Sequence, residues 1–89
     1  MADVISLNVL TPLGVSLEEK VRYVNIPMKD GSVGILAGHA PMLCAVSEGA
    51  LKYSYTNGEE KLLKVGSGVA NVANNTVTVL VDKVKMEKE

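Results

Sequence analysis

Short apolar runs with a period of two, broken by turn residues, are the feature that most restricts how this chain can fold. In Val4–Leu10 ("VISLNVL"), the residues Ile5, Leu7 and Val9 fall on one face. Side chains alternate between the two faces of a strand, so the pattern predicts a strand whose Ile5 face is buried. Turn signals recur about every 8–12 residues, a spacing typical of a β-sandwich or barrel. We therefore predict an all-β fold.

Two pairs of residues mark predicted hairpin turns. Asn57-Gly58 separates "ALKYSY" from "KLLKV", and we predict a two-residue loop with positive φ at both positions. Asn74-Asn75 separates "VANVA" from "TVTVLV" and predicts a second tight turn, because Asn enters the left-handed region readily. Lys20–Ile26 ("KVRYVNI") predicts a further strand, although its apolar residues do not keep to one face.

Composition limits the class of protein. A chain of 89 residues is long enough for a single domain. The net charge of -1 and the three Tyr residues do not favour binding to nucleic acid. The single Cys does not suggest a disulfide scaffold. The start "MADVISLNVL" does not resemble a signal peptide, and no run of apolar residues is long enough to span a membrane. We expect a soluble protein of a reducing compartment without direct membrane insertion.

The stretch Gly34–Val46 ("GILAGHAPMLCAV") holds the only histidine, His39, and the only cysteine, Cys44. A small β-sandwich enzyme using these two residues is one possible function, and it would need the thiolate within hydrogen-bond reach of the imidazole. In a strand beginning at Met42, however, Cys44 shares a face with apolar neighbours. Burial there would raise the pKa of the thiol and make it inert. We favour a packing role for Cys44 and a capping or interface role for His39.

Other short motifs do not indicate a cofactor or a metal. His39 has no Cys, His or acidic partner at ligand spacing. Gly66–Asn71 ("GSGVAN") begins like a dinucleotide motif but has Asn at the third glycine and no βαβ pattern around it, so it predicts a bend. Lys29–Gly34 ("KDGSVG") lacks the alternating acids of a calcium loop and predicts a turn. Without a catalytic constellation, the closely shaped loops favour a binding module.

Two longer stretches match a known family. Val21–Leu51 contains Val-x-x-Val-x-x-Pro, a glycine-containing acidic turn and Gly-His-Ala-Pro, and Lys61–Asp82 ends in "NNTVTVLVD". With these motifs, essentially the whole chain resembles the epsilon subunit of the F-type (rotary, proton-translocating) ATP synthase. The resemblance implies a single domain, a sandwich of about ten short antiparallel strands. It also implies a non-catalytic role in proton-driven ATP synthesis, joining the gamma subunit to the membrane rotor ring of c subunits.

The family resemblance also implies where the partners bind. The gamma-facing surface would include Thr11, His39, Ala40 and Pro41, and the ring-facing turn would be Asp30, Gly31 and Ser32. The isolated domain is expected to be a monomer with an adhesive apolar patch. The complex would lie peripherally at the cytoplasmic face of a bacterial plasma membrane.

The chain departs from the family pattern at several positions. Ser32 stands where many members have an acid, and Ala37 stands where Pro usually precedes Gly-His. Leu17 and Glu19 replace a common aromatic residue and a Gly. The helical hairpin that inhibits hydrolysis or binds ATP in some members does not follow Glu89. We therefore expect a sandwich domain over residues 1–82 and a charged tail over residues 83–89, the start of a linker, and attribute neither of those two functions to this chain.

Overall fold

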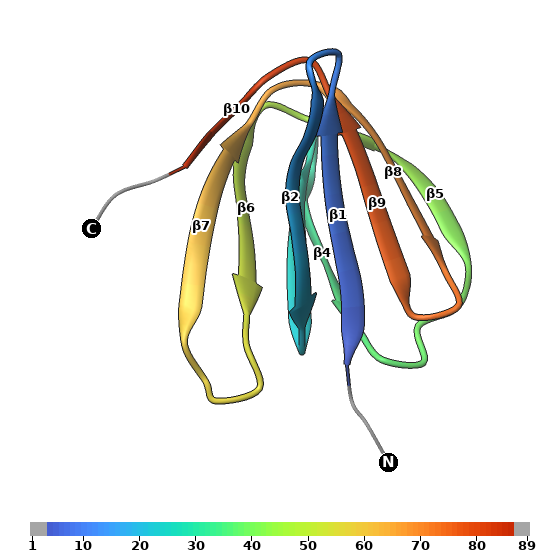
Figure 1. Ribbon diagram of the computed structural model, residues 1–89. Helices are drawn as coiled ribbons and strands as arrows, with labels where there is room; N and C mark the ends of the chain where they lie inside the picture. The colour runs from blue at the N-terminus through green and yellow to red at the C-terminus, as the bar shows by residue number, and fades with distance from the viewer. Residues whose placement is uncertain (1–3, 87–89) are drawn as a thin grey trace.

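The computed structural model describes residues 4–86, which form ten β-strands and, within that range, no helix (Figure 1). The strands are β1 (Ile5–Thr11), β2 (Gly14–Val21), β3 (Tyr23–Met28), β4 (Gly31–Leu36), β5 (Met42–Val46), β6 (Gly49–Ser54), β7 (Glu60–Val65), β8 (Gly68–Ala73), β9 (Thr76–Val81) and β10 (Val84–Met86). The all-β prediction is confirmed.

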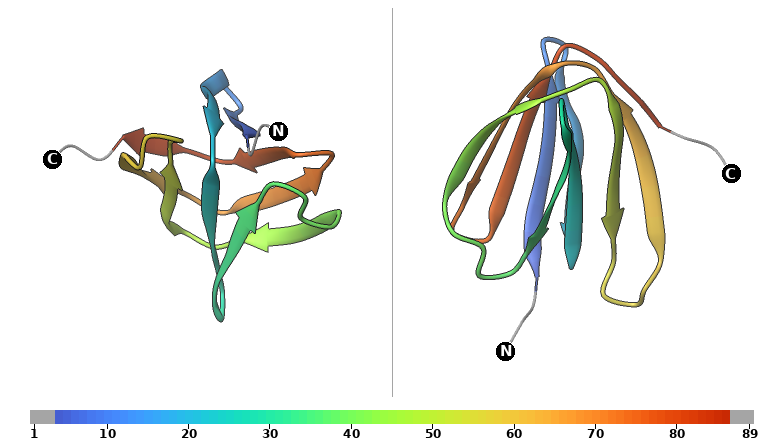
Figure 2. Two further views of the ribbon diagram at one scale, coloured as in Figure 1. Left: turned by 90° about the horizontal axis from the view of Figure 1, so that it is seen from below. Right: turned by 180° about the vertical axis from the view of Figure 1, so that it is seen from behind.

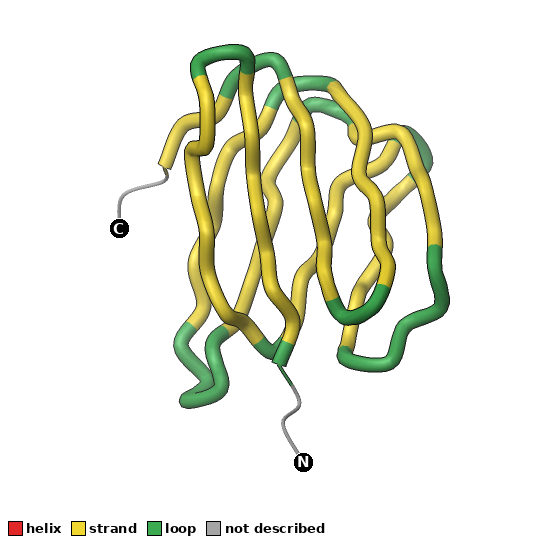
Figure 3. Tube along the Cα trace, turned by 45° about the vertical axis from the view of Figure 1, so that its right-hand side comes forward, coloured by secondary structure: helices red, strands yellow, loops and turns green. Residues whose placement is uncertain are grey.

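The strands form two five-stranded sheets. Sheet A has the order β2-β1-β9-β8-β5, and sheet B has the order β10-β7-β6-β3-β4. Figure 2 shows this arrangement from below and from behind, and Figure 3 shows the loops gathered at the two ends of the strands. One end carries the β1–β2, β3–β4 and β7–β8 connections, and we call it the β1–β2 end. The opposite end carries the β4–β5, β6–β7 and β8–β9 connections, and we call it the β8–β9 end.

The core lies between the sheets and follows the alternation of the sequence. In β1 the buried side chains are Ile5, Leu7 and Val9, as predicted. Strands β9 and β6 contribute buried residues at every second position in the same way. Within the described residues, no charged side chain is buried. The period of two therefore accounts directly for which face of each strand is covered.

The predicted strand Lys20–Ile26 proves to be two strands in different sheets. Strand β2 ends at Val21 in sheet A, and β3 begins at Tyr23 in sheet B, with Arg22 between them. The Arg22 N–H donates to the Ser54 carbonyl oxygen at 2.8 Å. Val21 and Val24 are both buried although three positions separate them. The apolar residues of this stretch do not keep to one face because the chain passes from sheet A to sheet B at Arg22.

One pairing departs from the expected antiparallel pattern. Strand β1 pairs with β9 in parallel, with Val9 opposite Val79 and Leu10 opposite Leu80. The other pairings between described strands are antiparallel. Parallel neighbours cannot be joined by a tight turn, and these two strands stand near opposite ends of the chain. Local turn signals could therefore not indicate their pairing.

The two Asn-containing turns differ from each other. Asn74 and Asn75 have φ of 52° and 57°, so a two-residue turn of the predicted kind joins β8 to β9. At Asn57-Gly58 the predicted two-residue loop is wrong, because only Gly58 has a positive φ, 93°. The Gly58 N–H donates to Tyr55 O at 2.9 Å, and the Tyr55 N–H donates to Glu59 O at 2.8 Å. This is a longer loop with a type I turn and a left-handed Gly, the next most common hairpin geometry.

We expect Gly58→Val to destabilise the domain by about 1–3 kcal/mol, because a β-branched residue is strained at positive φ. No atom lies within 4 Å of the position that a Gly58 Cβ would take, so the cost comes from the backbone alone. The measurement is the midpoint of denaturant unfolding. Gly58→Asn is the control and should lose less, since Asn tolerates this conformation. An unchanged midpoint in the Val variant would contradict the left-handed assignment.

Part of the segment expected to be a charged tail, residues 83–89, is a strand of sheet B. Val84–Met86 form β10, which pairs with β7 through Val84 opposite Val65. Residues 87–89 of that expected tail lie outside the described residues. The sheet thus continues past residue 82.

Candidate functional site

The β4–β5 loop that carries His39 is held by hydrogen bonds at its start. The His39 N–H donates to Leu36 O at 3.1 Å, which closes a turn with Gly38 at φ 86°. The Gly38 N–H donates to Asn75 Oδ1 at 2.7 Å, and this bond ties the loop to the β8–β9 turn. Positive φ at the third position of such a turn favours Gly. The conformation of the loop is therefore set by Gly38 and by a turn distant in sequence.

His39 itself is half-buried and makes a local contact. Its Nδ1 lies 2.7 Å from the Ala40 carbonyl oxygen, and since a carbonyl only accepts, this bond places the proton on Nδ1. Ala40 and Pro41, which follow it, are exposed. Nε2 is then the ring nitrogen left to contact a partner.

Cys44 takes the packing position predicted for it. It lies in β5 and packs against the core together with Met42. Burial raises the pKa of the Cys44 thiol, which opposes formation of the thiolate. No hydrogen bond joins Cys44 to His39 in the described part of the chain. The arrangement does not favour a Cys–His nucleophile pair.

Residues 4–86 contain neither a metal-binding cluster nor a membrane-spanning helix. No group of three or more His, Cys, Asp or Glu side chains in that range could hold a metal ion. Nor does that range contain a helix of the length and apolarity needed to cross a bilayer.

Tyr53 is a titratable residue whose side chain is fully enclosed in the core. Its ring meets the Tyr55 ring edge-on, with centroids 5.9 Å apart. Burial, with smaller contributions from Tyr55 and Glu19, raises the pKa of Tyr53 to about 12. Tyr53 therefore stays neutral at physiological pH and acts as a packing residue.

The turn predicted to face the ring lies at the β1–β2 end. Met28 pairs with Gly31, so Lys29 and Asp30 form the turn, and Gly31 has φ 139°. Asp30, Gly31 and Ser32 are all exposed. The turn can thus offer a carboxylate and backbone to a partner.

The residues predicted to face gamma are not brought together. Thr11 ends β1 at the β1–β2 end, and its Oγ1 accepts a hydrogen bond from the Leu13 N–H at 3.2 Å. His39, Ala40 and Pro41 lie at the β8–β9 end, next to Asn75. Strand β1 spans Ile5–Thr11, so the two groups are separated by roughly 20 Å. A single partner that contacts both must cover the length of sheet A.

Sheet A has an apolar surface that sequence reasoning did not identify. On its outer face, one residue from each strand stands in cross-strand register with the next. We call this set the apolar row: Val15, Leu10, Leu80, Val69 and Ala45, in strand order β2-β1-β9-β8-β5. Val15 is 62% exposed, Leu80 49% and Val69 43%. Leu13, in the adjoining β1–β2 turn, is 99% exposed.

The rest of this outer face is mostly polar. The next row down contains Glu18, Asn8, Thr78 and Asn71, followed by Leu43 on β5. Below it, the Lys20 ammonium donates to Ser6 Oγ at 2.7 Å. Exposed apolar residues that gather in one row, rather than scatter singly, mark an interaction surface. Each strand of sheet A contributes one residue to the apolar row, but the sequence does not show that these residues are neighbours. Only the strand register brings them into one row.

Comparison with known proteins gives the family. The family model for "ATP synthase, Delta/Epsilon chain, beta-sandwich domain" matches residues 4–87. The chain belongs to this family. Curated relatives include the ATP synthase epsilon chain of Desulfitobacterium hafniense (strain DSM 10664 / DCB-2), 34% identical over 82 residues, with 92% of this chain and 61% of the relative covered. The epsilon chain of Nitratidesulfovibrio vulgaris (strain DSM 19637 / Miyazaki F) is 36% identical over 89 residues, covering 100% of this chain and 66% of the relative.

Solved structures of the same fold come from mitochondrial assemblies. A chain in the cryo-EM structure of Euglena gracilis mitochondrial ATP synthase, described as OSCP/F1/c-ring, superposes with a TM-score of 0.89 at 23% identity, covering 97% of this chain and 55% of that one. A chain in the Tetrahymena thermophila central stalk/c-ring structure gives 0.75 at 17% identity, covering 92% and 66%. At these identities the likeness establishes the sandwich fold. The chain spans 61–66% of the length of the curated family members cited here.

Proposed function

We propose that this chain is a non-catalytic coupling subunit of an ATP synthase central stalk, which joins the gamma subunit to the rotor ring of c subunits. The family match over residues 4–87 is the observation that carries this proposal. In that role the sandwich transmits torque through static contacts and makes no bond itself. The complex lies peripherally at the cytoplasmic face of a bacterial plasma membrane, as its bacterial relatives suggest.

The proposed gamma surface is the outer face of sheet A. The apolar row offers an apolar centre for such an interface, and Thr11 continues the surface at the β1–β2 end. His39, Ala40 and Pro41 would be reached by a partner that covers the sheet to its β8–β9 end. A polar periphery around an apolar centre is the usual composition of a protein interface.

The proposed ring surface is the Asp30, Gly31 and Ser32 turn. It lies at the β1–β2 end and belongs to sheet B, so a ring contact there leaves the outer face of sheet A to gamma. Neither surface requires a cofactor. The inward position of Cys44 supports this role over an enzyme that uses His39 and Cys44.

The test is a binding titration of the chain with the purified gamma subunit from the same source, followed by co-sedimentation of that complex with the rotor ring. We expect saturable binding to gamma and retention of the complex on the ring. Sedimentation of the chain alone should show a monomer. A chain that binds neither partner, or that forms a tight dimer through the apolar row, would argue against the proposal.

His39→Ala should change the free energy of unfolding by no more than about 0.5 kcal/mol, because the only hydrogen bond that its side chain makes among the described residues is the local one to Ala40. Its affinity for gamma should fall about fivefold, as expected for truncation of a moderate interface residue. Denaturant unfolding and a binding titration measure the two effects separately. Lost stability with unchanged affinity would show that His39 serves the fold instead.

A further inference from the structure

Strand β5 forms an edge of sheet A that is open to pairing with another strand. Among the described strands it pairs only with β8. An edge strand has unpaired N–H and C=O groups along its free side, and these can bond to a strand of another chain. Proteins usually prevent such pairing with charged side chains, bulges, Pro or very short edge strands. The four edge strands of the two sheets differ in which of these features they have.

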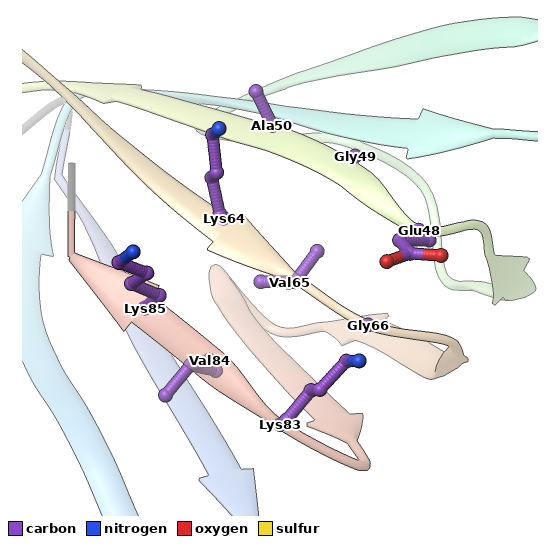
Figure 4. Close-up of a pocket in the computed structure, with 9 residues that line it drawn as sticks. All are labelled: Glu48, Gly49, Ala50, Lys64, Val65, Gly66, Lys83, Val84 and Lys85. Atoms are coloured by element: carbon purple, nitrogen blue, oxygen red, sulfur yellow. The ribbon is translucent and has the colours of Figure 1, made fainter.

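Two of the edge strands, β2 and β10, are protected. Glu18 and Lys20 on β2 are exposed, and the register of β2 with β1 shifts part-way along the strand. Strand β10 has only three residues and carries Lys85, which lies opposite Lys64 on β7 (Figure 4). Charge, irregular register and short length therefore oppose strand addition at these two edges.

The remaining edge strands, β4 and β5, are uncharged. Residues 31–47, which include both strands, contain no Asp, Glu, Lys or Arg, although 21% of the residues in the chain are charged. Strand β4 contains Gly31 and Gly34, and glycine weakens a strand. Strand β5 (MLCAV) contains neither glycine nor proline, and its Leu43 is exposed. Of the four edges, β5 is therefore the best suited to accept another strand.

The free edge of β5 has defined limits. Pro41, which precedes it, has no N–H to donate. After β5, the Ser47 N–H donates to the Pro27 carbonyl oxygen at 3.0 Å. Between these limits, Met42–Val46 pair with β8 along their whole length. In an antiparallel pair, alternate residues direct their N–H and C=O groups away from the partner strand. These outward groups are the bonding positions for an added strand.

We propose that an extended segment of the gamma subunit adds to sheet A beside β5. This inference rests on the proposed function, in which gamma covers the outer face of sheet A. The apolar row ends on β5 at Ala45, and the loop that carries His39 leads directly into β5. A partner on that face therefore reaches this edge. In strand addition, main-chain hydrogen bonds provide affinity and the side chains at alternate positions provide specificity.

The side chains of β5 define the chemistry of the added segment. On the outer face, the segment would have Leu43 and Ala45 as cross-strand neighbours. On the inner face it would lie beside Met42 and Cys44, which pack against the core. None of these four side chains carries a charge at neutral pH that could pair with a charge on gamma. The segment is therefore extended, mostly apolar and uncharged, without proline where it bonds to β5.

The first experiment measures backbone amide hydrogen exchange in the free chain and in its complex with purified gamma. In the free chain, the alternate β5 amides that do not bond to β8 should exchange fast. In the complex, we expect their exchange to slow by at least about tenfold, because a hydrogen-bonded amide exchanges only when its bond opens. Gamma that contacts only the outer face would not supply these bonds, so the fast set would stay fast.

Three outcomes of this experiment would overturn the proposal. Binding of gamma without slower exchange in β5 would overturn strand addition alone and leave the proposed function intact. No binding of gamma would overturn both. Slow exchange of the whole of β5 in the free chain, increasing with protein concentration, would show that a second copy of the chain occupies the edge instead.

The second experiment compares Leu43→Lys with Leu36→Lys. A lysine on an edge strand opposes pairing, because its charge would have to be desolvated. We expect Leu43→Lys to weaken gamma binding by about tenfold or more and to abolish the slower exchange in β5. Leu36→Lys is the matched control, since Leu36 is an exposed leucine of the edge strand β4 on sheet B.

The control should bind gamma within about twofold of the unchanged chain and keep the slower exchange in β5. Equal losses of affinity in the two variants, or slower exchange that survives in Leu43→Lys, would contradict strand addition at β5. The exchange pattern separates strand addition from a contact of Leu43 with gamma on the outer face. Denaturant unfolding of each variant shows that the fold is intact.

Discussion

Gly68→Ala is expected to destabilise the domain severely. A Cβ at position 68 would overlap the Leu80 carbonyl oxygen and lie 2.8 Å from both Leu80 C and Val81 Cα. These are backbone atoms of the central strand β9, so they cannot move aside as a side chain could. Gly68 pairs directly with Val81 where β8 meets β9. The sheet must therefore separate locally at the point where the chain crosses from sheet B to sheet A.

We expect a loss of more than about 3 kcal/mol, against a total stability of roughly 4–13 kcal/mol for a domain of this size. Circular dichroism and denaturant unfolding would measure it. Gly66→Ala is the matched control, two residues away. There the added Cβ meets the side chain of Asp82, which is exposed and can rotate away. A Gly68 variant as stable as the Gly66 variant would show that β8 and β9 are not so closely apposed.

Alternation along single strands was the part of the fold that the sequence predicted best. The buried positions of β1 follow from the period of two in Val4–Leu10, and Cys44 lies on the inward face predicted for it. Such a pattern is local, so it needs no knowledge of neighbouring strands. The Asn57-Gly58 hairpin is predicted in the same way, yet its loop is longer, because the local pattern does not show that pairing stops at Ser54 and Glu60.

Features that depend on long-range pairing could not be predicted from local patterns. The switch of sheets at Arg22 is visible only as uneven sidedness, and the parallel pairing of β1 with β9 joins residues some 70 positions apart. The apolar row has the same origin. Leu10, Leu80 and Val69 are unremarkable one by one, and they become a surface only through the register of four strand pairs.

The candidate site shows the same limit. The family resemblance named Thr11 and His39 as facing one partner, but the strand between them places them at opposite ends of sheet A. The outer face of sheet A lies between Thr11 and His39, and local sequence motifs do not predict which residues form that face. The surface proposed for gamma is therefore larger than the motif residues and is centred on strands instead of loops.

Leu80→Glu should reduce affinity for the gamma subunit by at least about 30-fold, the effect expected for an interface hot spot. Leu80 lies in the middle strand of sheet A, between Leu10 and Val69 in the apolar row. A carboxylate there would have to be desolvated without a partner when gamma covers it. In the free chain the same side chain is about half exposed, so the fold should lose little stability. Calorimetric titration with gamma measures the affinity.

The control is Leu62→Glu on the outer face of sheet B, where Leu62 pairs with Lys52. This variant makes the same Leu-to-Glu replacement as Leu80→Glu, but on sheet B, the sheet that does not carry the proposed interface. Its affinity for gamma should stay within about twofold of the unchanged chain, since a site outside an interface contributes little. Equal losses in the two variants would point to general charge repulsion, and a loss confined to Leu62→Glu would place gamma on sheet B. Only a loss confined to Leu80→Glu assigns the apolar row to gamma. The two variants carry the same substitution, and they differ in that Leu80 belongs to the apolar row on sheet A whereas Leu62 lies on sheet B.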